Sequence, residues 1–296
     1  MALGRATARA GTPGRAEAGS KLQARGENVP RTIWFLWFQG LDKAPYVVRK
    51  CHESWMAKNP GWRVACLDDE SLQTVASTDY YAGSFATLSR QQRSDLLRLD
   101  LLARHGGVWA DATCFCMQPL DRWLPANLDS GFFAFSRPRA ERIISTWFLA
   151  AEPGNILVSR LYEFMSGYWG SHPFRGDRQA LSSRALTRFL RVSPRTRSWL
   201  FSQVIKDWLA ISPYYAMHFA FEKLVREDPE CARVWARTPQ VSAVLPHRLR
   251  RAGLLSPASA SIRSEIDRRE VPIYKTAWNL KQAIPESSTL GYLLRG

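Results

Sequence analysis

The stretch from Arg93 to Cys116, RSDLLRLDLLARHGGVWADATCFC, constrains the fold more than any other part of this sequence. Its first half carries leucines at helical spacing, which predicts a helix with a dense apolar face. We expect Gly106 and Gly107 to end this helix, because glycine adopts left-handed backbone angles at little cost. A short strand that begins at Val108 should then follow. The stretch therefore predicts a helix, a sharp turn and a strand.

Polar residues of this stretch are candidate site residues. Asp95 and Arg98 share one side of the predicted helix, and Asp111 follows the predicted strand. We therefore expect Asp95, Arg98 and Asp111 to converge at the edge of one cleft. Asp111, with the hydroxyl of Thr113 two residues on, suits Mg²⁺ or Mn²⁺ held by one carboxylate together with substrate phosphates. The Asp-x-x-Arg pair suits sugar recognition, because the carboxylate accepts from hydroxyls and the guanidinium donates to hydroxyls or phosphates.

The order of apolar segments predicts the fold class. Residues 32–38, between Pro30 and Gly40, form a short apolar and aromatic run typical of a buried first strand. The following β-α-β-α order predicts a parallel sheet with right-handed crossovers. The predicted helices are 46–58 and one that follows a turn at 152–155, and the further predicted strands are 62–67, 131–135 and 143–150. We therefore predict an α/β fold.

The second half of the chain reads differently. Residues 177–237 look mainly helical, with segments at 181–190, 199–209 and 213–226, whereas 246–261 look loop-like. Residues 271–279 form an ordered-looking motif that precedes a polar tail. Residues 1–28 are rich in Ala, Gly and Arg without a hydrophobic period, so we predict a disordered basic tail. Residues 29–296 are then one domain, whose C-terminal helical part covers about 154–296.

Composition excludes some classes of protein and leaves others open. Across 296 residues no apolar run is long enough for a spanning helix, and the N-terminus lacks the apolar region of a secretory signal. Five cysteines without a paired CxxC spacing fit a reducing compartment. Cys114 and Cys116 should be small buried hydrophobes. The net charge of +15 fits an anionic membrane or a phosphate-rich substrate, and without any nucleic-acid-binding signature we predict no nucleic-acid partner.

Several further residues are candidates, and some of them have two interpretations. Trp37, Phe38 and Gln39 follow the first predicted strand, where ligands of open α/β sheets collect, although Trp37 equally suits the core. Lys275, in a late loop, suits closure over phosphates. His218 suits either packing or substrate contact. The triplet Asp68-Asp69-Glu70 suits metal binding, but a helix N-cap is the simpler interpretation.

Three stretches together resemble a known family. They are VPRTIWFLWFQG (29–40), SDLLRLDLLARHGGVWADATCFC (94–116) and VPIYKTAW (271–278). Their order resembles the capsular polysaccharide synthesis proteins, which belong with glycosyltransferases that carry a DXD-type sugar-binding region, similar to glycosyltransferase family 32. The wider group is similar to glucosylating toxins and fungal mannosyltransferases. The resemblance implies a GT-A-like, Rossmann-type nucleotide-sugar-binding core with mainly helical C-terminal additions, a divalent metal, and retention of anomeric configuration.

The resemblance also implies roles for individual residues. Trp37 matches the tryptophan that stacks on the donor base, and Asp95 with Arg98 matches the pair that holds donor sugar hydroxyls. Asp111 matches the first aspartate of the DXD region. Thr113 stands where the second aspartate, normally the direct metal ligand, is found. That departure puts the dependence on Mn²⁺ or Mg²⁺ in question.

These observations lead to a functional hypothesis. We expect a glycosyltransferase of the hexosyltransferase type that moves a sugar from a nucleotide-diphosphate donor, such as a UDP-sugar, to a glycan or lipid-linked acceptor in cell-surface or capsular polysaccharide synthesis. We expect it in the cytoplasm, peripherally at the inner membrane face, where the basic surface suits anionic lipid. The alternative is a non-catalytic sugar-nucleotide or glycan-binding protein derived from a transferase.

Overall fold

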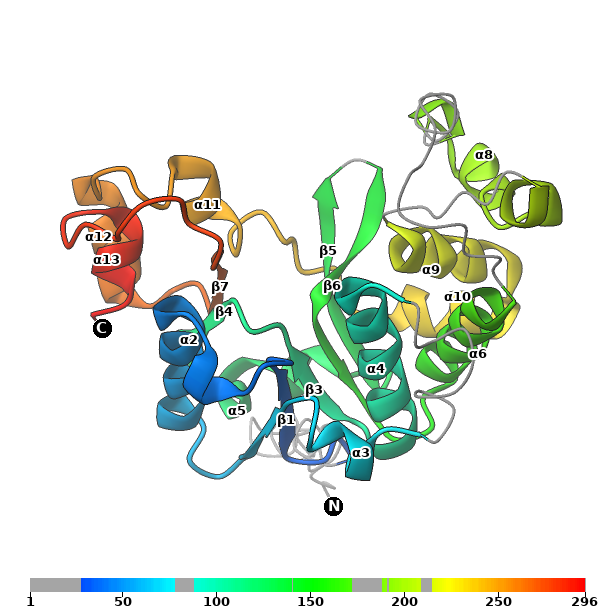
Figure 1. Ribbon diagram of the computed structural model, residues 1–296, viewed down its shortest axis with the longest axis horizontal. Coiled ribbons are helices and arrows are strands. Elements are labelled where there is room, and N and C mark those ends of the chain that lie inside the picture. Colours follow the sequence, from blue (N-terminus) through cyan, green and yellow to red (C-terminus); the bar gives the residue numbers. More distant parts are fainter. Residues whose placement is uncertain are drawn as a thin grey trace, which may run out of the picture.

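The fold is a mixed α/β sheet with helices on both faces, seen in a computed structural model (Figure 1). The structure describes residues 28–77, 88–139, 141–171, 188–190, 192–208 and 215–295. The main sheet has five strands in the order β2-β1-β3-β6-β5. Their bounds are Thr32–Leu36 (β1), Arg63–Leu67 (β2), Gly107–Ala110 (β3), Phe132–Arg139 (β5) and Arg142–Ala151 (β6). The predicted α/β class is confirmed.

Strand direction divides the sheet into two parts. β1 pairs in parallel with both β2 and β3, as the β-α-β order predicts. β6 runs antiparallel to β3, and β5 runs antiparallel to β6. The expectation of a parallel sheet therefore holds only for the first three strands. β5 and β6 follow one another with almost no intervening chain, and so short a connection joins only antiparallel strands.

One face of the sheet is covered by four helices, α4 (Arg90–His105), α6 (Ile156–Gly170), α9 (Ala216–Glu227) and α10 (Pro229–Arg237) (Figure 1). α4 starts where the sequence supplies a capping box: Ser89 Oγ accepts from the Gln92 N–H, and the Gln92 side chain accepts from the Ser89 N–H. Its leucines are buried against this face, together with Trp109 of β3. α4 thus places Asp95 and Arg98 beside the end of β3.

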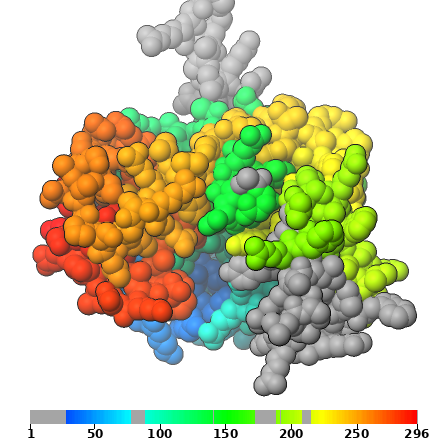
Figure 2. Space-filling model, turned by 90° about the horizontal axis from the view of Figure 1, so that it is seen from above, coloured from blue at the N-terminus to red at the C-terminus, as the bar shows by residue number. Residues whose placement is uncertain are grey.

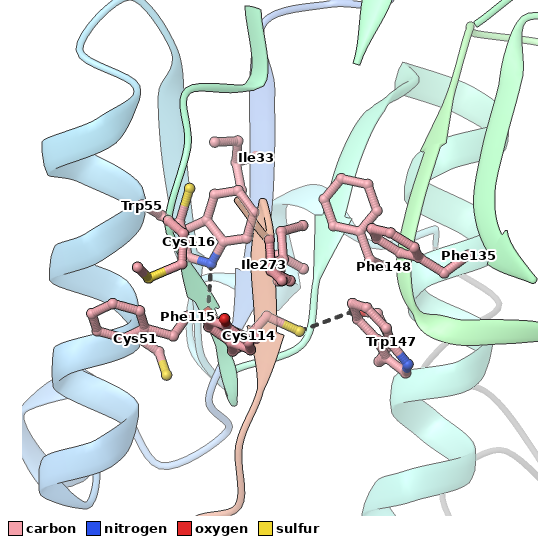
Figure 3. Close-up of a cluster of buried hydrophobic side chains, with 14 of the residues drawn as sticks. Ile33, Cys51, Trp55, Cys114, Phe115, Cys116, Phe135, Trp147, Phe148 and Ile273 are labelled. Atoms are coloured by element: carbon pink, nitrogen blue, oxygen red, sulfur yellow. Dashed lines mark hydrogen bonds between the residues drawn. The ribbon is translucent and has the colours of Figure 1, made fainter. Parts of the chain in front are cut away.

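The other face packs against α2 (Tyr46–Lys58), α5 (Leu120–Trp123) and a two-stranded sheet of β4 (Cys114–Cys116) and β7 (Ile273–Lys275). Figure 3 shows its core, in which the Trp55 indole donates to the Cys114 carbonyl at 2.9 Å. All five cysteines are free thiols, and Cys114 and Cys116 are fully buried, which confirms their prediction as small hydrophobes. Because β7 pairs with β4, the C-terminal region is anchored to the chain directly after Asp111.

The remaining elements include some that sequence reasoning missed. The segment 246–261, expected to be a loop, contains α11 (Arg248–Ala252) and the start of α12 (Ala260–Arg268). The expected polar tail contains α13 (Thr289–Leu293), whose Leu290 and Leu293 are buried. Apolar residues that are scattered in sequence meet on one short helix, which a search for long periodic segments does not detect. The other short elements are η1 (Leu41–Lys43), α3 (Leu72–Val75), η4 (Pro125–Asn127), α8 (Pro194–Trp199) and the π-helical η5 (Val204–Trp208).

Parts of the sequence predictions fall where the structure gives no description. The predicted tail lies outside the described residues except for Asn28, and of the predicted helix 181–190 only 188–190 is described. The predicted helix 199–209 corresponds instead to the end of α8 followed by η5.

Figure 2 shows the β5–β6 hairpin in green between the orange C-terminal segment and the yellow-green α8 region. Among the described residues, no helix combines the length and apolar character needed to cross a membrane.

Candidate functional site

The turn between α4 and β3 sets the position of Asp111. Gly106 and Gly107 have φ values of 63° and 93°, which side chains rarely adopt. A Cβ atom on Gly107 would lie 2.6 Å from the Thr32 carbonyl oxygen, so β3 pairs closely with β1 only because this residue has no side chain. At the other end of β3 the Asp111 N–H donates to the Trp147 carbonyl at 2.9 Å. The Asp111 backbone is therefore fixed against β6.

Arg98 joins the acidic residues of the site. Its guanidinium lies 3.1 Å from Asp95 Oδ1 through Nη1 and 3.2 Å from Asp111 Oδ1 through Nη2. Nη1 also donates to the Thr146 carbonyl at 2.7 Å, and the guanidinium lies over the Trp109 ring at 5.1 Å. Arg98 is only 5% exposed, so both ion pairs are shielded from solvent on the Arg98 side. The structure thus brings together the three residues that the sequence predicted to converge.

Lys275 reaches the same carboxylate from the C-terminal region. Lys275 is the register partner of Cys114 in the β4–β7 pair, which aims its side chain at the end of β3. Its Nζ donates to Asp111 Oδ2 at 2.7 Å, while the Trp109 indole donates to Oδ1 at 2.9 Å. Sequence reasoning placed Lys275 in a loop, whereas the structure places it in a strand and 8% exposed. Both oxygens of Asp111 are thus engaged by protein donors.

The two carboxylates differ in how easily they ionise. Burial alone would raise the pKa of Asp111, but Lys275 and Arg98 outweigh it, and the pKa lies below its ordinary value. Burial raises the pKa of Asp95 to about 6, against the opposing effect of Arg98 and with a smaller contribution from the Asp111 charge. Asp111 is therefore a fixed negative charge at neutral pH, whereas Asp95 changes its charge in a mildly acidic range.

An aromatic pocket of ≈ 720 Å³ opens on one side of this cluster. We call it the aromatic lobe; its wall includes Trp37, Phe38, Gln39, Trp109 and Trp278 together with Asp95, Arg98, Asp111 and Thr113. The Trp37 ring meets the Trp278 ring edge-on, with centroids 5.4 Å apart. Trp37 is only partly buried, and its buried Nε1–H makes no hydrogen bond to the described residues. An unpaired buried donor in a pocket wall favours the site reading of Trp37 over the core reading.

A second pocket of ≈ 820 Å³ opens on the other side of Asp95 and Asp111, which line both. We call it the basic lobe, because Arg139, Arg142, Arg250, Arg251 and Lys275 line it. His218 lies here rather than in the aromatic lobe, against the Tyr215 ring. Burial and the nearby Arg142 lower the pKa of His218 to about 3, so this side chain is neutral. It is thus placed for contact with a ligand, though not with one confined to the aromatic lobe.

Other predicted residues have structural roles. Asp68 Oδ1 accepts from the Ser71 N–H at 2.8 Å, and Ser71 is the N-cap residue of α3. The acidic triplet therefore shapes the turn before α3 but does not supply its N-cap, so the capping prediction is wrong. None of its residues lines either lobe. Sequence reasoning missed Thr146, Trp109 and Trp278 as site residues. Trp109 and Trp278 each carried a signal, because they belong to the family-like stretches 94–116 and 271–278, whereas Thr146 carried none.

The residues around Asp111 do not fit a directly bound divalent ion as they are arranged. Lys275 occupies one carboxylate oxygen, and Arg98 and Trp109 occupy the other. Asp95, the neighbouring carboxylate, is itself paired with Arg98. Across the part of the chain that the structure describes, no three His, Cys, Asp or Glu side chains gather in a group able to hold a metal. The predicted ligation by Asp111 and Thr113 would require Lys275 to move away.

The fold and site define an α/β protein with a two-lobed ligand pocket, in which an acid–cation cluster separates an aromatic lobe from a basic one. The family model described as capsular polysaccharide synthesis protein matches residues 14–177, which is more than half of the chain. The protein belongs to this family.

Individual relatives are more distant. The chain is 27% identical over 158 residues to the putative glycosyltransferase HOC1 of Saccharomyces cerevisiae, which covers 45% of this chain and 39% of that protein. It is 25% identical over 159 residues to the O-glycosyltransferase braB of Annulohypoxylon truncatum, covering 47% of this chain and 38% of that protein. The chain thus spans about two-fifths of the length of these curated relatives. The solved PaToxG glycosyltransferase is similar with a TM-score of 0.40 and 15% identity over 95% of this chain and 94% of that one, a likeness too distant to define the fold.

Proposed function

We propose that the protein is a glycosyltransferase that moves a sugar from a nucleotide-diphosphate donor, such as a UDP-sugar, to a glycan or lipid-linked acceptor. The observation that carries this proposal is the position of Asp95, Arg98 and Asp111 between an aromatic and a basic lobe. A nucleotide sugar needs an aromatic surface for its base, hydrogen-bonding groups for its sugar and positive charge for its diphosphate. Membership of the family and the names of the relatives support the same reaction class.

Each part of the donor has a matching group. The base would lie against Trp37, whose buried N–H lacks a protein partner among the described residues. The sugar hydroxyls would donate to Asp95 and accept from Arg98. Asp111 would act as a positioning residue, since it holds Lys275 and Arg98 in place by direct ion pairs. This assignment gives the aromatic lobe one complete nucleotide sugar, which suits its volume of ≈ 720 Å³.

Charge compensation at the diphosphate is the main electrostatic requirement of the reaction. Because the contacts of Asp111 do not fit a bound divalent ion, we assign this task to Lys275 and to Arg98 of the aromatic lobe, which both pair with Asp111. A lysine ammonium 2.7 Å from Asp111 is already oriented before the donor arrives. Preorganised charge of this kind needs no rearrangement during the reaction.

The transfer step would retain the anomeric configuration, as the family resemblance implies. The bond between the anomeric carbon and the diphosphate oxygen breaks, and the acceptor hydroxyl oxygen bonds to the same face of that carbon. The leaving diphosphate oxygen takes the hydroxyl proton, so no protein base is required. Asp95 and Asp111 are unsuited to that task in this arrangement, because each is ion-paired to Arg98.

Donor turnover provides the direct test. A panel of nucleotide sugars is screened by thermal shift, since a ligand at 100 times its Kd stabilises a protein by about 2.7 kcal/mol. The best donor is then incubated alone and with acceptors, and release of nucleoside diphosphate is measured. We expect slow release without acceptor and loss of that release in Asp111→Asn. Undiminished turnover by Asp111→Asn would remove the central role given to this residue.

A non-catalytic sugar-nucleotide or glycan-binding protein is the second candidate. The observation that favours it is Thr113 in place of the second DXD aspartate, together with the closed ion pairs of Asp111. Such a protein would give the thermal shift with a nucleotide sugar but no release of nucleoside diphosphate with any acceptor.

The catalytic proposal includes a role in cell-surface or capsular polysaccharide synthesis at the inner face of the membrane, where basic surface residues would meet anionic lipid.

A further inference from the structure

The basic lobe contains more positive charge than its carboxylates compensate. Four arginines and Lys275 face Asp95, Asp111 and Glu141 across this lobe. Asp95 and Asp111 are already paired with Arg98, which belongs to the aromatic lobe, and Asp111 also binds Lys275. The arginines at 139, 142, 250 and 251 therefore have Glu141 as their main acidic neighbour in the lobe wall. A concave surface with this excess attracts an anion.

Two buried donors in the same wall lack hydrogen-bond partners among the described residues. Ser145 is 1% exposed, and its Oγ makes no hydrogen bond. Arg142 Nε is buried as well, and the nearest carboxylate oxygen, Glu141 Oε1, lies 3.8 Å away. The Arg142 guanidinium is held over the Tyr215 ring at 4.4 Å. Buried unpaired donors are unfavourable, so a ligand with several acceptor oxygens would complete them.

The two histidines of the lobe are neutral, so binding of an anionic ligand there does not depend on their charge. Burial lowers the pKa of His218 to about 3 and that of His247 to about 4, with nearby arginines acting in the same direction. His247 Nε2 accepts from the Trp147 indole at 3.2 Å, which fixes its ring. Charge recognition in the lobe is therefore the work of guanidinium groups, which bind phosphate oxygens in a bidentate manner.

The basic lobe is separate from the aromatic wall of the pocket. It adjoins the aromatic lobe at Asp95, Asp111 and Thr146, and Trp37 and Trp278 line only the aromatic lobe. Volumes of ≈ 820 Å³ and ≈ 720 Å³ each lie in the range of a whole ligand site, so the two lobes suit two substrates. The reacting carbon of the donor would lie near the shared wall.

From these contacts we infer that the basic lobe binds a phosphoryl group of the acceptor, and that the acceptor is a phosphorylated sugar or a diphosphate-linked glycosyl lipid. This inference rests on the proposed transferase function, because only a transferase has an acceptor substrate. Arg142 and Ser145 bind the phosphoryl oxygens from the β5–β6 hairpin. Arg250 and Arg251 of α11 approach from the C-terminal segment, and both are exposed.

The first test measures binding. Inorganic pyrophosphate is titrated by calorimetry into the wild type saturated with the nucleoside diphosphate of the best donor. We expect Arg142→Ala and the double variant Arg250→Ala/Arg251→Ala to raise the Kd of pyrophosphate about tenfold, which is the loss of one or two charge-assisted hydrogen bonds. The double variant changes exposed residues, so it remains informative if Arg142→Ala fails to fold. Arg268→Ala, which removes the same charge outside the lobe, should change the Kd less than about twofold.

The second test compares acceptors of one sugar: its neutral alkyl glycoside, its 1-phosphate and its short-chain alkyl diphosphate. We expect both phosphorylated acceptors to be used at least about tenfold better than the glycoside, and the better of the two identifies the source of the phosphoryl group. Equal use of all three would overturn the inference, as would an equally large loss of nucleoside diphosphate affinity in the arginine variants. Donor hydrolysis without acceptor is recorded in parallel, so failure of the transferase proposal is seen separately.

Discussion

Lys275 Nζ lies 2.7 Å from Asp111 Oδ2, and this ion pair joins the C-terminal strand β7 to the end of the central strand β3. The two residues are 164 positions apart in sequence. A carboxylate that the sequence predicted as a metal ligand is thus paired with a lysine. The charge of Lys275 lowers the pKa of Asp111 and keeps it ionised. The Lys275–Asp111 ion pair thus connects the C-terminal region directly to the candidate site.

Lys275→Ala should lower donor turnover roughly a hundredfold, because one preorganised cation at a developing charge contributes about that much. Lys275→Arg keeps the charge and should retain a larger share of the activity. Steady-state release of nucleoside diphosphate at saturating donor measures both variants. Wild-type turnover in Lys275→Ala would show that the diphosphate is neutralised elsewhere.

Chelation should leave the wild type largely active, because Lys275, Arg98 and Trp109 occupy both oxygens of Asp111. Turnover is compared after dialysis against EDTA and after addition of Mn²⁺. Lys275→Ala is the matched variant: it frees one Asp111 oxygen, so Mn²⁺ should stimulate it more than the wild type. Complete loss of wild-type activity in EDTA, restored by Mn²⁺, would return Asp111 to the role of a metal ligand.

Trp37→Ala should weaken binding of the nucleoside diphosphate by about 1–3 kcal/mol, the contribution of one base stacked on an aromatic ring. Calorimetry measures the change, and Trp37→Phe should lose less. Trp199→Ala is the control, since Trp199 is 62% exposed and lies outside both lobes. A change of only a few tenths of a kcal/mol would assign Trp37 to the core.

Donor affinity should fall as the pH decreases through about 6, where Asp95 becomes protonated and can no longer accept from two sugar hydroxyls. The effect on stability has the opposite sign. Native Asp95 holds its proton more tightly than the unfolded chain does, so its contribution to stability is lost as the pH rises from its ordinary pKa to about 6. Calorimetry and urea unfolding across this range test both, and Asp95→Asn should abolish both pH dependences.

Gly107→Ala should reduce the free energy of unfolding by roughly 3 kcal/mol or more, because φ is 93° and the new Cβ would lie 2.6 Å from the Thr32 carbonyl oxygen. Gly154→Ala separates the two causes. Gly154 has a φ of 69° but no atom within 4 Å of the added Cβ, so it should lose only about 1–2 kcal/mol. Urea unfolding measures both variants. Equal losses of stability would show that the close contact between the new Cβ and β1 adds nothing to the backbone strain.

Much of the first half of the fold was predictable because its signals are local. The helix 46–58 matches α2 at both ends, and the glycine pair ends α4 as expected. The direction of β6 was not predictable from the β-α-β order, since it depends on the hairpin with β5. The helices α11 and α13 were missed because each has five residues, too few for a periodic pattern.

Some residues of the candidate site were predictable from the sequence and others were not. The spacing of Asp95, Arg98 and Asp111 around one helix and one turn was sufficient to predict that they meet. Arg142, Ser145 and Arg250 carry no motif, and nothing in their sequence neighbourhood indicates a shared pocket. They meet because the β5–β6 hairpin and α11 both contribute side chains to the wall of the basic lobe.

By itself the sequence determined the helix, the double-glycine turn and the strand that lead to Asp111. The reason is that capping, helical periodicity and backbone freedom act over a few residues. Only the tertiary structure decided which charges surround that aspartate. Lys275 arrives through β-sheet pairing between distant segments, and ion pairs depend on distances in space that local chemistry does not specify. The identity of the groups that neutralise Asp111, and so the expected independence from metal, follows from the fold.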